Sequence, residues 1–246
     1  MNINTVTTAE LEDYRFCPLY FKLNKQYPTS IKRYIPSSIY LEPIKEGINN
    51  YFESIFITNS DPNEKELLSI IMKIFDKTSG LNSNDKFLYS PKIQKMLDNA
   101  SYLFQRLEPL LDNIILHPIR FNIYMEHGGC SVIGRAYPIV KYNNESVVLY
   151  FDHDGPMDLQ KQFTDINFGT YLLWLHDNAH GVKKVVNIDI KQPSKKYKVF
   201  DLNFSVMHII QQSISSIISG IKSEFFYPVS QEKCHSCVGD CYHYFK

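Results

Sequence analysis

The spacing of apolar residues predicts helices through the first half of the chain. In the first of them Leu11, Tyr14 and Phe16 would face a core. Thr7 or Thr8 would cap its N-terminus, ahead of acidic residues that are favoured in the first turn. Pro18 is expected to end this helix. Three more helical patterns cover residues 41–56, 61–80 and 91–109, and the second of these begins at Asp61-Pro62, a capping residue followed by a first-turn proline.

From residue 119 onward, short segments with strand character replace the helical period. Gly128-Gly129 and Asn143-Asn144 supply turns between the first three of these segments. The predicted strands are 119–126, 130–142, 146–152, 183–191 and 197–202, and the predicted helices among and after them are 158–177 and 204–225. This order predicts an α/β or α+β core behind a helical N-terminal half.

Composition and charge narrow the class of protein. The chain has 246 residues, of which 44% are hydrophobic, with 26 basic and 26 acidic side chains. These values exclude a disordered chain and argue against bulk electrostatic binding of nucleic acid, although a local basic groove stays possible. No segment approaches the ~20 apolar residues of a membrane helix, and the polar N-terminus lacks a signal-peptide pattern. We therefore expect a cytoplasmic protein with reduced cysteines and no membrane association.

The C-terminal cysteines have the spacing of a metal or cluster site. Cys234, Cys237 and Cys241 are separated by two and three residues, so their thiolates can converge on one centre. A fourth ligand is required, and Cys17, His235 and His243 are candidates. Zinc and a 4Fe–4S cluster are both chemically allowed, and the alternative is three reduced cysteines with no metal. Cys130 lies on a predicted strand and is expected in the core.

Four stretches of the chain together resemble a known family. They are an opening helix that ends in Cys-Pro and an aromatic pair (6–21), a hydrophobic-Gly-Arg strand (132–137), a helix with the Asn-x-x-x-Tyr pattern (167–171), and a closing helix with the cysteine tail (218–241). In this order they resemble the PD-(D/E)XK nuclease superfamily, in particular the RecB-like branch that contains CRISPR-associated iron–sulfur nucleases and AddB-like recombination nucleases. The resemblance implies a restriction-endonuclease-like core with a central mixed sheet flanked by helices.

The resemblance also implies an organisation and a cofactor. Residues 1–118 would form a helical region that contributes Cys17, residues 119–225 the nuclease-like core, and residues 226–246 a tail that closes the cluster. In the family, one N-terminal and three C-terminal cysteines bind a 4Fe–4S cluster, which implies Cys17, Cys234, Cys237 and Cys241 as its ligands. The family usually has five residues between the last two cysteines where this chain has three, and zinc therefore stays open as the alternative.

The same comparison implies a degenerate active site. Family members hold Mg²⁺ or Mn²⁺ with a helix His, an Asp and a second acid, and a Lys assists the attacking water. The corresponding positions here are Lys45 near the His, Tyr137 and Phe151 at the two acids, and His153 at the Lys. Phenol, benzyl and imidazole groups do not replace two carboxylates as Mg²⁺ ligands, so no catalytic residue is predicted.

Two sequence features could still support cleavage. Asp152 and Asp154 flank His153, and a slip of one residue along the strand would place Asp152 inward, although it would also turn the strand's apolar residues to the wrong face. Separately, Asp189-Ile190-Lys191 is a literal Asp-x-Lys, but it follows the helix instead of lying in the preceding hairpin.

Basic and aromatic residues suggest a groove for single-stranded nucleic acid, in which phosphates meet cations and bases stack on rings. The alternative is a set of solvated surfaces. The candidate residues are Lys22, Lys25, Arg33, Arg135, Tyr171, Lys195 and Lys196.

Three hypotheses of function follow. The first is a catalytically inactive nuclease-fold protein with an iron–sulfur cluster, which binds nucleic acid or serves as a scaffold for protein partners in a larger DNA- or RNA-processing complex. The second is an active Mg²⁺- or Mn²⁺-dependent single-strand DNA exonuclease, and the third is a protein-interaction module that binds no nucleic acid. The abundance of Asn, Ile, Lys and Tyr suggests an AT-rich genome such as that of a phage or other virus, in which case the host cytoplasm is the expected location.

Overall fold

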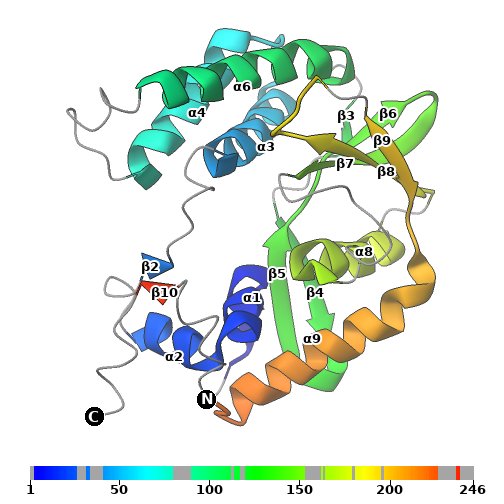
Figure 1. The fold of residues 1–246 in the computed structure, drawn as a ribbon. Helices are drawn as coiled ribbons and strands as arrows, with labels where there is room; N and C mark the ends of the chain where they lie inside the picture. The colour runs from blue at the N-terminus through cyan, green and yellow to red at the C-terminus, as the bar shows by residue number, and fades with distance from the viewer. Residues whose placement is uncertain are drawn as a thin grey trace.

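The computed structural model describes residues 3–26, 32–33, 41–79, 90–111, 114–116, 120–152, 162, 164–178, 181–194, 197–226 and 237–238. It is a mixed α/β structure in which helices and two mixed sheets form two packed halves (Figure 1). Along the described ranges, no helix combines the length and apolar character needed to cross a membrane.

The larger sheet has the order β3-β6-β7-β8-β9. Its strands are β3 (Ile114–Leu116), β6 (Ile139–Tyr142), β7 (Glu145–Asp152), β8 (Lys184–Asp189) and β9 (Lys198–Asp201). Only β7 and β8 pair in parallel, and the other neighbours are antiparallel. The parallel pair is connected through α8, as expected for a crossover between parallel strands.

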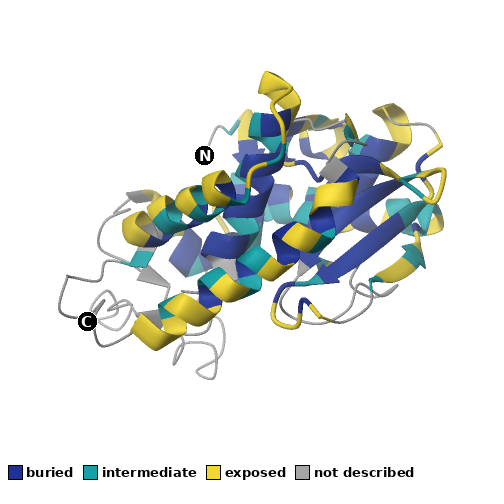
Figure 2. Ribbon diagram, turned by 90° about the horizontal axis from the view of Figure 1, so that it is seen from above, coloured by how far each residue is buried: buried dark blue, intermediate teal, exposed yellow. Residues whose placement is uncertain are grey.

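Alternating side chains of β7 enter two different cores. Leu149 and Phe151 pack with α3 (Leu41–Thr58), α4 (Glu64–Ser79) and α6 (Ser90–Leu111). Val148 and Tyr150 pack on the opposite side with α8 (Ile166–Asn178). Figure 2 shows the result, since the strands are mostly buried while the helices expose one side. A strand covered on both faces reads as a nearly continuous apolar run, which is the pattern of residues 147–151.

The smaller sheet has the order β1-β5-β4. Its strands are β1 (Thr5–Thr7), β5 (Cys130–Arg135) and β4 (Arg120–Met125), and the short helix η1 (Glu126–Gly128) joins β4 to β5. One face of this sheet packs with α8 and with α9 (Met207–Lys222), which follows η2 (Phe204–Val206). The buried face of α9 is a row of isoleucines at helical spacing: Ile210, Ile214, Ile218 and Ile221.

Two helices at the N-terminus pack beside this sheet. In α1 (Thr8–Phe16) the predicted cap is confirmed, because the Thr7 side chain accepts from the Glu10 N–H while the Glu10 carboxylate accepts from the Thr7 N–H. Pro18 ends α1 as predicted, but it also begins a second helix, α2 (Pro18–Gln26), because proline is well suited to a first helical position. A short antiparallel pair, β2 (Lys32–Arg33) with β10 (Cys237–Val238), joins the end of the chain to its beginning.

The predicted order of helices and strands is confirmed, but β1, α2, β2, β3 and β10 were not predicted. The predicted strand 130–142 divides into β5 and β6. The cap of α4 is Asn63 and not Asp61, since the Asn63 Oδ1 accepts from the N–H groups of Lys65 and Glu66. The Asn143-Asn144 turn is confirmed, with φ of 51° and 64° at the two residues, as a type I′ hairpin turn requires.

Candidate functional site

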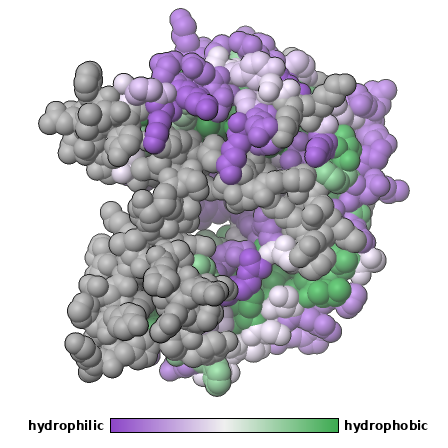
Figure 3. Space-filling model, in the orientation of Figure 1, coloured by the Kyte–Doolittle hydropathy of each residue, from purple (hydrophilic) through white to green (hydrophobic). Residues whose placement is uncertain are grey.

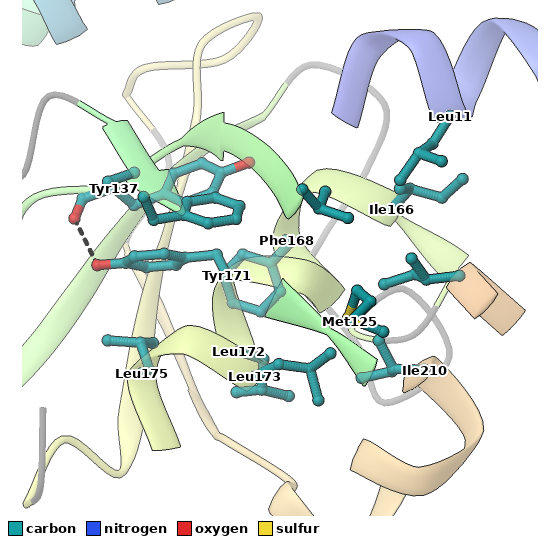
Figure 4. Close-up of a cluster of buried hydrophobic side chains, with 14 of the residues drawn as sticks. Leu11, Met125, Tyr137, Ile166, Phe168, Tyr171, Leu172, Leu173, Leu175 and Ile210 are labelled. Carbon is teal, nitrogen blue, oxygen red and sulfur yellow. Dashed lines mark hydrogen bonds between the residues drawn. The ribbon is translucent and has the colours of Figure 1, made fainter. Parts of the chain in front are cut away.

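Tyr137, which the resemblance aligns with the first acid of the PD-(D/E)XK nucleases, lies inside an aromatic cluster. The residue follows β5, and its side chain is only 4% exposed. Its ring centroid is 5.3 Å from that of Tyr150, 5.5 Å from that of Phe168 and 5.3 Å from that of Tyr171. Figure 4 shows how the rings of Tyr137 and Tyr171 lie against each other in this packed interior. Carbon surfaces fill the space that a carboxylate and its metal ion would need.

Both polar ends of Tyr137 already have partners. Its hydroxyl oxygen accepts from Asn167 Nδ2 at 2.9 Å, and its carbonyl oxygen accepts from the Tyr171 hydroxyl at 2.8 Å. Burial raises the pKa of Tyr171 well above its usual range, and the hydrogen bond to the Tyr137 carbonyl only partly offsets this. The Tyr171 phenol therefore stays protonated at neutral pH and acts as a donor.

Asn167, at the position of the family's Gln, links three elements. Its Oδ1 accepts from the Thr8 hydroxyl at 2.7 Å and from the Arg135 N–H at 3.2 Å, while its Nδ2 also donates to the Arg135 carbonyl at 3.1 Å. Helix α8 is thereby held to the end of β5 and to the start of α1. These hydrogen bonds use the amide for structure and leave it without a free group aimed at a metal site.

Phe151, at the position of the second acid, faces away from Tyr137. It is fully buried in the core formed with α3, where its ring centroid is 5.9 Å from that of Phe52. Tyr137 belongs to the other core, on the α8 side. Acids at these two positions would enter different cores, so the implied pairing is absent among the described side chains. Lys45 on α3 is partly exposed.

The remaining positions implied by the resemblance lie mostly outside the described residues. His153 and Asp154 are among them, and so is the side chain of Asp152. The backbone of Asp152 ends β7 and pairs with Asp189 at the end of β8. The Asp189 Oδ1 accepts from the N–H groups of Lys191 at 2.9 Å and Gln192 at 3.2 Å. The carboxyl ends of the two parallel strands thus bring two aspartates to paired positions.

The N-terminal cysteine is the only one of the four implied cluster ligands whose side chain is described. Cys17 is buried and reduced at the junction of α1 and α2, and its Sγ accepts from the Tyr20 N–H at 3.5 Å. The thiol is therefore held at the N-terminal end of α2, close to the start of the chain. Within the described ranges, no group of three or more His, Cys, Asp or Glu side chains could hold a metal ion. Cys234 and Cys241 lie outside those ranges, as does the side chain of Cys237.

The remaining cysteine, Cys130, and the two histidines of the tail are the other residues that the sequence raised as possible or excluded ligands. Cys130 is fully buried, as expected, and burial raises the pKa of its thiol, although the Lys222 ammonium opposes this shift. His235 and His243, which the tail offered as further ligand candidates, lie outside the described residues.

Four of the residues predicted to bind nucleic acid have side chains that the structure describes, namely Lys22, Lys25, Arg135 and Tyr171. Lys22 lies 5.4 Å above the Phe226 ring, and Lys25 pairs with Glu10 at 2.5 Å. Tyr171 is 0% exposed, so it is a core residue and no ligand can reach it in this structure. Arg33, Lys195 and Lys196 have side chains outside the described ranges. Lys22, Lys25 and Arg135 are exposed, and Arg135 also lines a cleft.

That cleft lies between β5, the start of α1 and the facing side of α3. It has a volume of about 540 Å³, and Figure 3 shows a hollow near the centre of the molecule, at the level where α3 lies above β5 in Figure 1. The side chains around it are mostly polar or charged. The principal ones are Thr8, Glu46, Asn50, Glu53, Arg120 and Arg135.

Two exposed residues of β4 were missed by the sequence reasoning. Arg120 lies directly across from Arg135 in the β4–β5 register, and Tyr124 is 62% exposed on the same side of the sheet. The sequence contained a signal for both residues. Alternate residues of β4 are polar, and a hairpin through Gly128-Gly129 would bring Arg120 opposite Arg135.

Comparisons with known proteins show the fold. No protein-family model matches the chain, and no curated protein matches it. Among solved structures, the crystal structure of a "putative exonuclease" from Eubacterium rectale aligns with a TM-score of 0.53. The alignment covers 99% of this chain and 88% of that chain at 11% sequence identity. The chain therefore shares the mixed α+β fold of that structure.

Proposed function

We propose that this protein is a catalytically inactive member of the nuclease-like fold, which acts as a nucleic-acid-binding or scaffolding subunit of a DNA- or RNA-processing assembly. The observation that carries the proposal is the packing of Tyr137, which fills the place of a metal-binding acid with a buried ring held by three aromatic neighbours. A fold that has lost its catalytic side chains still offers its surfaces to partners, because fold does not determine function.

Packing on both sides of β7 supports the inactive assignment. Hard cations such as Mg²⁺ require several oxygen ligands around one point. Tyr137 and Phe151 enter separate cores, and restoring acids at both positions would still not bring the two carboxylates together. The loss of the cation-binding site therefore follows from the packing of β7, and one substitution would not restore the site.

The proposal includes a 4Fe–4S cluster bound by Cys17, Cys234, Cys237 and Cys241, with zinc as the alternative. Its support is the buried Cys17 thiol beside the Tyr20 N–H and the β2–β10 pairing, which joins the backbone of Cys237 to that of Arg33. A centre shared by both ends of the chain would couple metal binding to folding. Its role would be structural.

The spectrum of anaerobically purified protein tests the cofactor. A brown sample with iron, sulfide and a broad absorption near ~400 nm would support the cluster, because thiolate-bound iron absorbs there. A colourless sample that contains zinc would replace the cluster by the alternative, and a metal-free folded sample would contradict both. Cys17→Ser should lower the metal content, whereas Cys130→Ser, at a buried cysteine that is not an implied ligand, should leave it unchanged.

Degradation of labelled single-stranded DNA with Mn²⁺ tests the inactive assignment. We expect no product above that seen with EDTA. Measurable, EDTA-sensitive cleavage that copurifies with the folded protein would overturn the proposal. Binding of the same DNA in EDTA at several salt concentrations then separates a nucleic-acid-binding subunit from a protein-interaction module, because only phosphate contacts give a salt-dependent affinity.

One observation favours active cleavage as the second candidate. The β7–β8 register pairs Asp152 with Asp189, and Lys191 follows two residues later. Carboxylates at the adjacent ends of parallel strands could share a hard cation. If Mn²⁺-dependent cleavage is found, Asp189→Asn should abolish it, while Asp177→Asn on the exposed end of α8 should not. Loss of activity in Asp189→Asn would assign the chemistry to this edge of the larger sheet.

A further inference from the structure

The smaller sheet has an outward face whose described side chains are exposed or only partly buried. Its inner face carries Phe121, Met125 and Val132, which are buried against the helices. Side chains alternate along a strand, so the residues between these point outward. The outward set combines cations, hydroxyls, an amide and a ring, and it includes no acidic side chain. Its members are Thr5, Thr7, Arg120, Asn122, Tyr124, Ser131, Ile133 and Arg135.

Two arginines lie directly opposite each other on this face. The β4–β5 register pairs Arg120 with Arg135, and both side chains are exposed. Like charges at directly opposed positions destabilise a sheet, so such a pair calls for an anion as its counterpart. Among the described residues, the Arg120 guanidinium has no hydrogen bond or ion pair. The Arg135 guanidinium donates to the neutral Asn50 Oδ1 and not to a carboxylate.

The two walls of the cleft differ in charge. Arg120 and Arg135 belong to the sheet wall, whereas Glu46 and Glu53 belong to the α3 wall. An anionic ligand would therefore lie against the sheet and away from α3. Asn50, which sits between the two acids in the helix sequence and holds Arg135, marks the boundary between the walls.

An exposed ring extends the same face beyond the arginines. Tyr124 is 62% exposed and lies four residues from Arg120 on β4, which is about 14 Å along a strand that rises ~3.4 Å per residue. Its cross-strand neighbour is Ser131, a small residue that leaves the ring face open. A planar base can stack on such a ring while hydroxyl and amide groups border it.

We infer that the outward face of β1, β5 and β4 binds a segment of single-stranded nucleic acid, with backbone phosphates on Arg120 and Arg135 and a base on Tyr124. Guanidinium groups bind phosphate oxygens in a bidentate manner, and two side by side fit a sugar–phosphate backbone that crosses the strands. A duplex does not expose a base face to the tyrosine, which favours a single strand over a double helix. This inference rests on the nucleic-acid-binding form of the proposed function.

Fluorescence anisotropy with labelled oligothymidine of about 15 nucleotides tests this face, with the full-length protein in EDTA so that no cleavage interferes. Arg120→Gln combined with Arg135→Gln should reduce the slope of log affinity against log salt by about 1.4, since each phosphate contact to a single strand contributes ~0.7. Tyr124→Ala should weaken binding about tenfold at one salt concentration, through lost stacking.

Matched controls come from similar residues on other surfaces. Lys73→Gln with Lys198→Gln removes two exposed cations from α4 and β9, and Tyr102→Ala removes a ring that is 43% exposed on α6. Both should leave the affinity and the salt slope unchanged. Far-ultraviolet circular dichroism and thermal melting would confirm that the face variants remain folded, as expected for exposed positions.

The possible outcomes test the location of the binding face separately from nucleic-acid binding by the protein as a whole. If the wild-type protein binds the oligonucleotide and the face variants bind it equally well, this face is not the binding surface, although the protein still binds nucleic acid. If the wild-type protein shows no salt-dependent binding, then both the binding face and nucleic-acid binding itself are wrong, and the protein-interaction module is favoured. A duplex bound as tightly as the single strand, with no effect of Tyr124→Ala, would refute the stacking role and with it the single-strand assignment.

Discussion

Replacing Tyr137 by aspartate tests whether this position is part of a packed core or still has the shape of a cation-binding site. Tyr137→Asp introduces the residue type that the resemblance to PD-(D/E)XK nucleases implies at this position. If the position is now part of the core, the carboxylate enters an apolar space bordered by Tyr150, Phe168 and Tyr171, and the protein loses stability. If the site retains its cation-binding shape, the aspartate should instead bind Mn²⁺ and gain stability from it.

The expected cost follows from the contacts of the ring. The Tyr137 side chain is 4% exposed, and removing a buried aromatic side chain costs about 3–5 kcal/mol. A carboxylate in the same place adds a penalty, or becomes protonated to avoid it, because burial raises the pKa of an acid. We therefore expect a loss of about 4 kcal/mol or more, which is a large part of the stability of an ordinary domain.

Urea denaturation followed by circular dichroism measures this loss, with and without Mn²⁺. Tyr137→Phe keeps the ring and removes the hydroxyl that accepts the Asn167 hydrogen bond, so it should cost about 1 kcal/mol. Tyr102→Asp places the same charge on the exposed side of α6 and should change the stability by no more than about 0.5 kcal/mol.

Two results would refute the reasoning. One is a Tyr137→Asp protein as stable as Tyr102→Asp, which would mean that the ring does not fill a packed core. The other is a Mn²⁺-dependent gain for Tyr137→Asp that the wild type lacks. A cation at 100 times its dissociation constant would add about 2.7 kcal/mol to the free energy of unfolding, a gain large enough for urea denaturation to detect. Should Tyr137→Asp fail to fold at all, Tyr137→Phe still tests the predicted hydrogen bond.

Three further predictions concern stability. Burial raises the pKa of Glu12, although Arg15 opposes the shift, so the wild type should lose stability as pH rises from about 4 through the raised pKa. Urea midpoints measured across this pH range should depend less on pH for Glu12→Gln than for the wild type. The same pH dependence in both proteins would contradict the shift. Gly134→Ala should cost about 1–3 kcal/mol, since its Cβ would overlap the Phe121 ring and lie 2.9 Å from Asn167 Oδ1; Ser131→Ala on the same strand is the control, and equal melting temperatures for the two would be inconsistent with the crowding. Arg120→Thr should raise stability by up to about 1 kcal/mol in thermal melts by removing a like-charge pair, and a loss would mean that the pair is not repulsive.

Part of this protein could be predicted from its sequence alone. The reciprocal cap at Thr7 and Glu10, the turn at Asn143-Asn144 and the isoleucine row of α9 depend on neighbours within a few residues. Such features follow from local hydrogen bonds and from the period of the apolar residues, which the sequence displays directly. The order of helices and strands was predictable for the same reason, and it led to the fold class that the comparison with a solved structure shows.

The features that bear on function were decided by the tertiary structure. A strand of three residues such as β1 has no period of its own and exists because the edge of β5 offers it hydrogen bonds. Likewise, nothing local shows that Tyr137 and Phe151 enter different cores, or that Arg120 lies opposite Arg135. Register and layer assignment depend on contacts between segments far apart in the chain, and no local pattern of residues specifies those contacts.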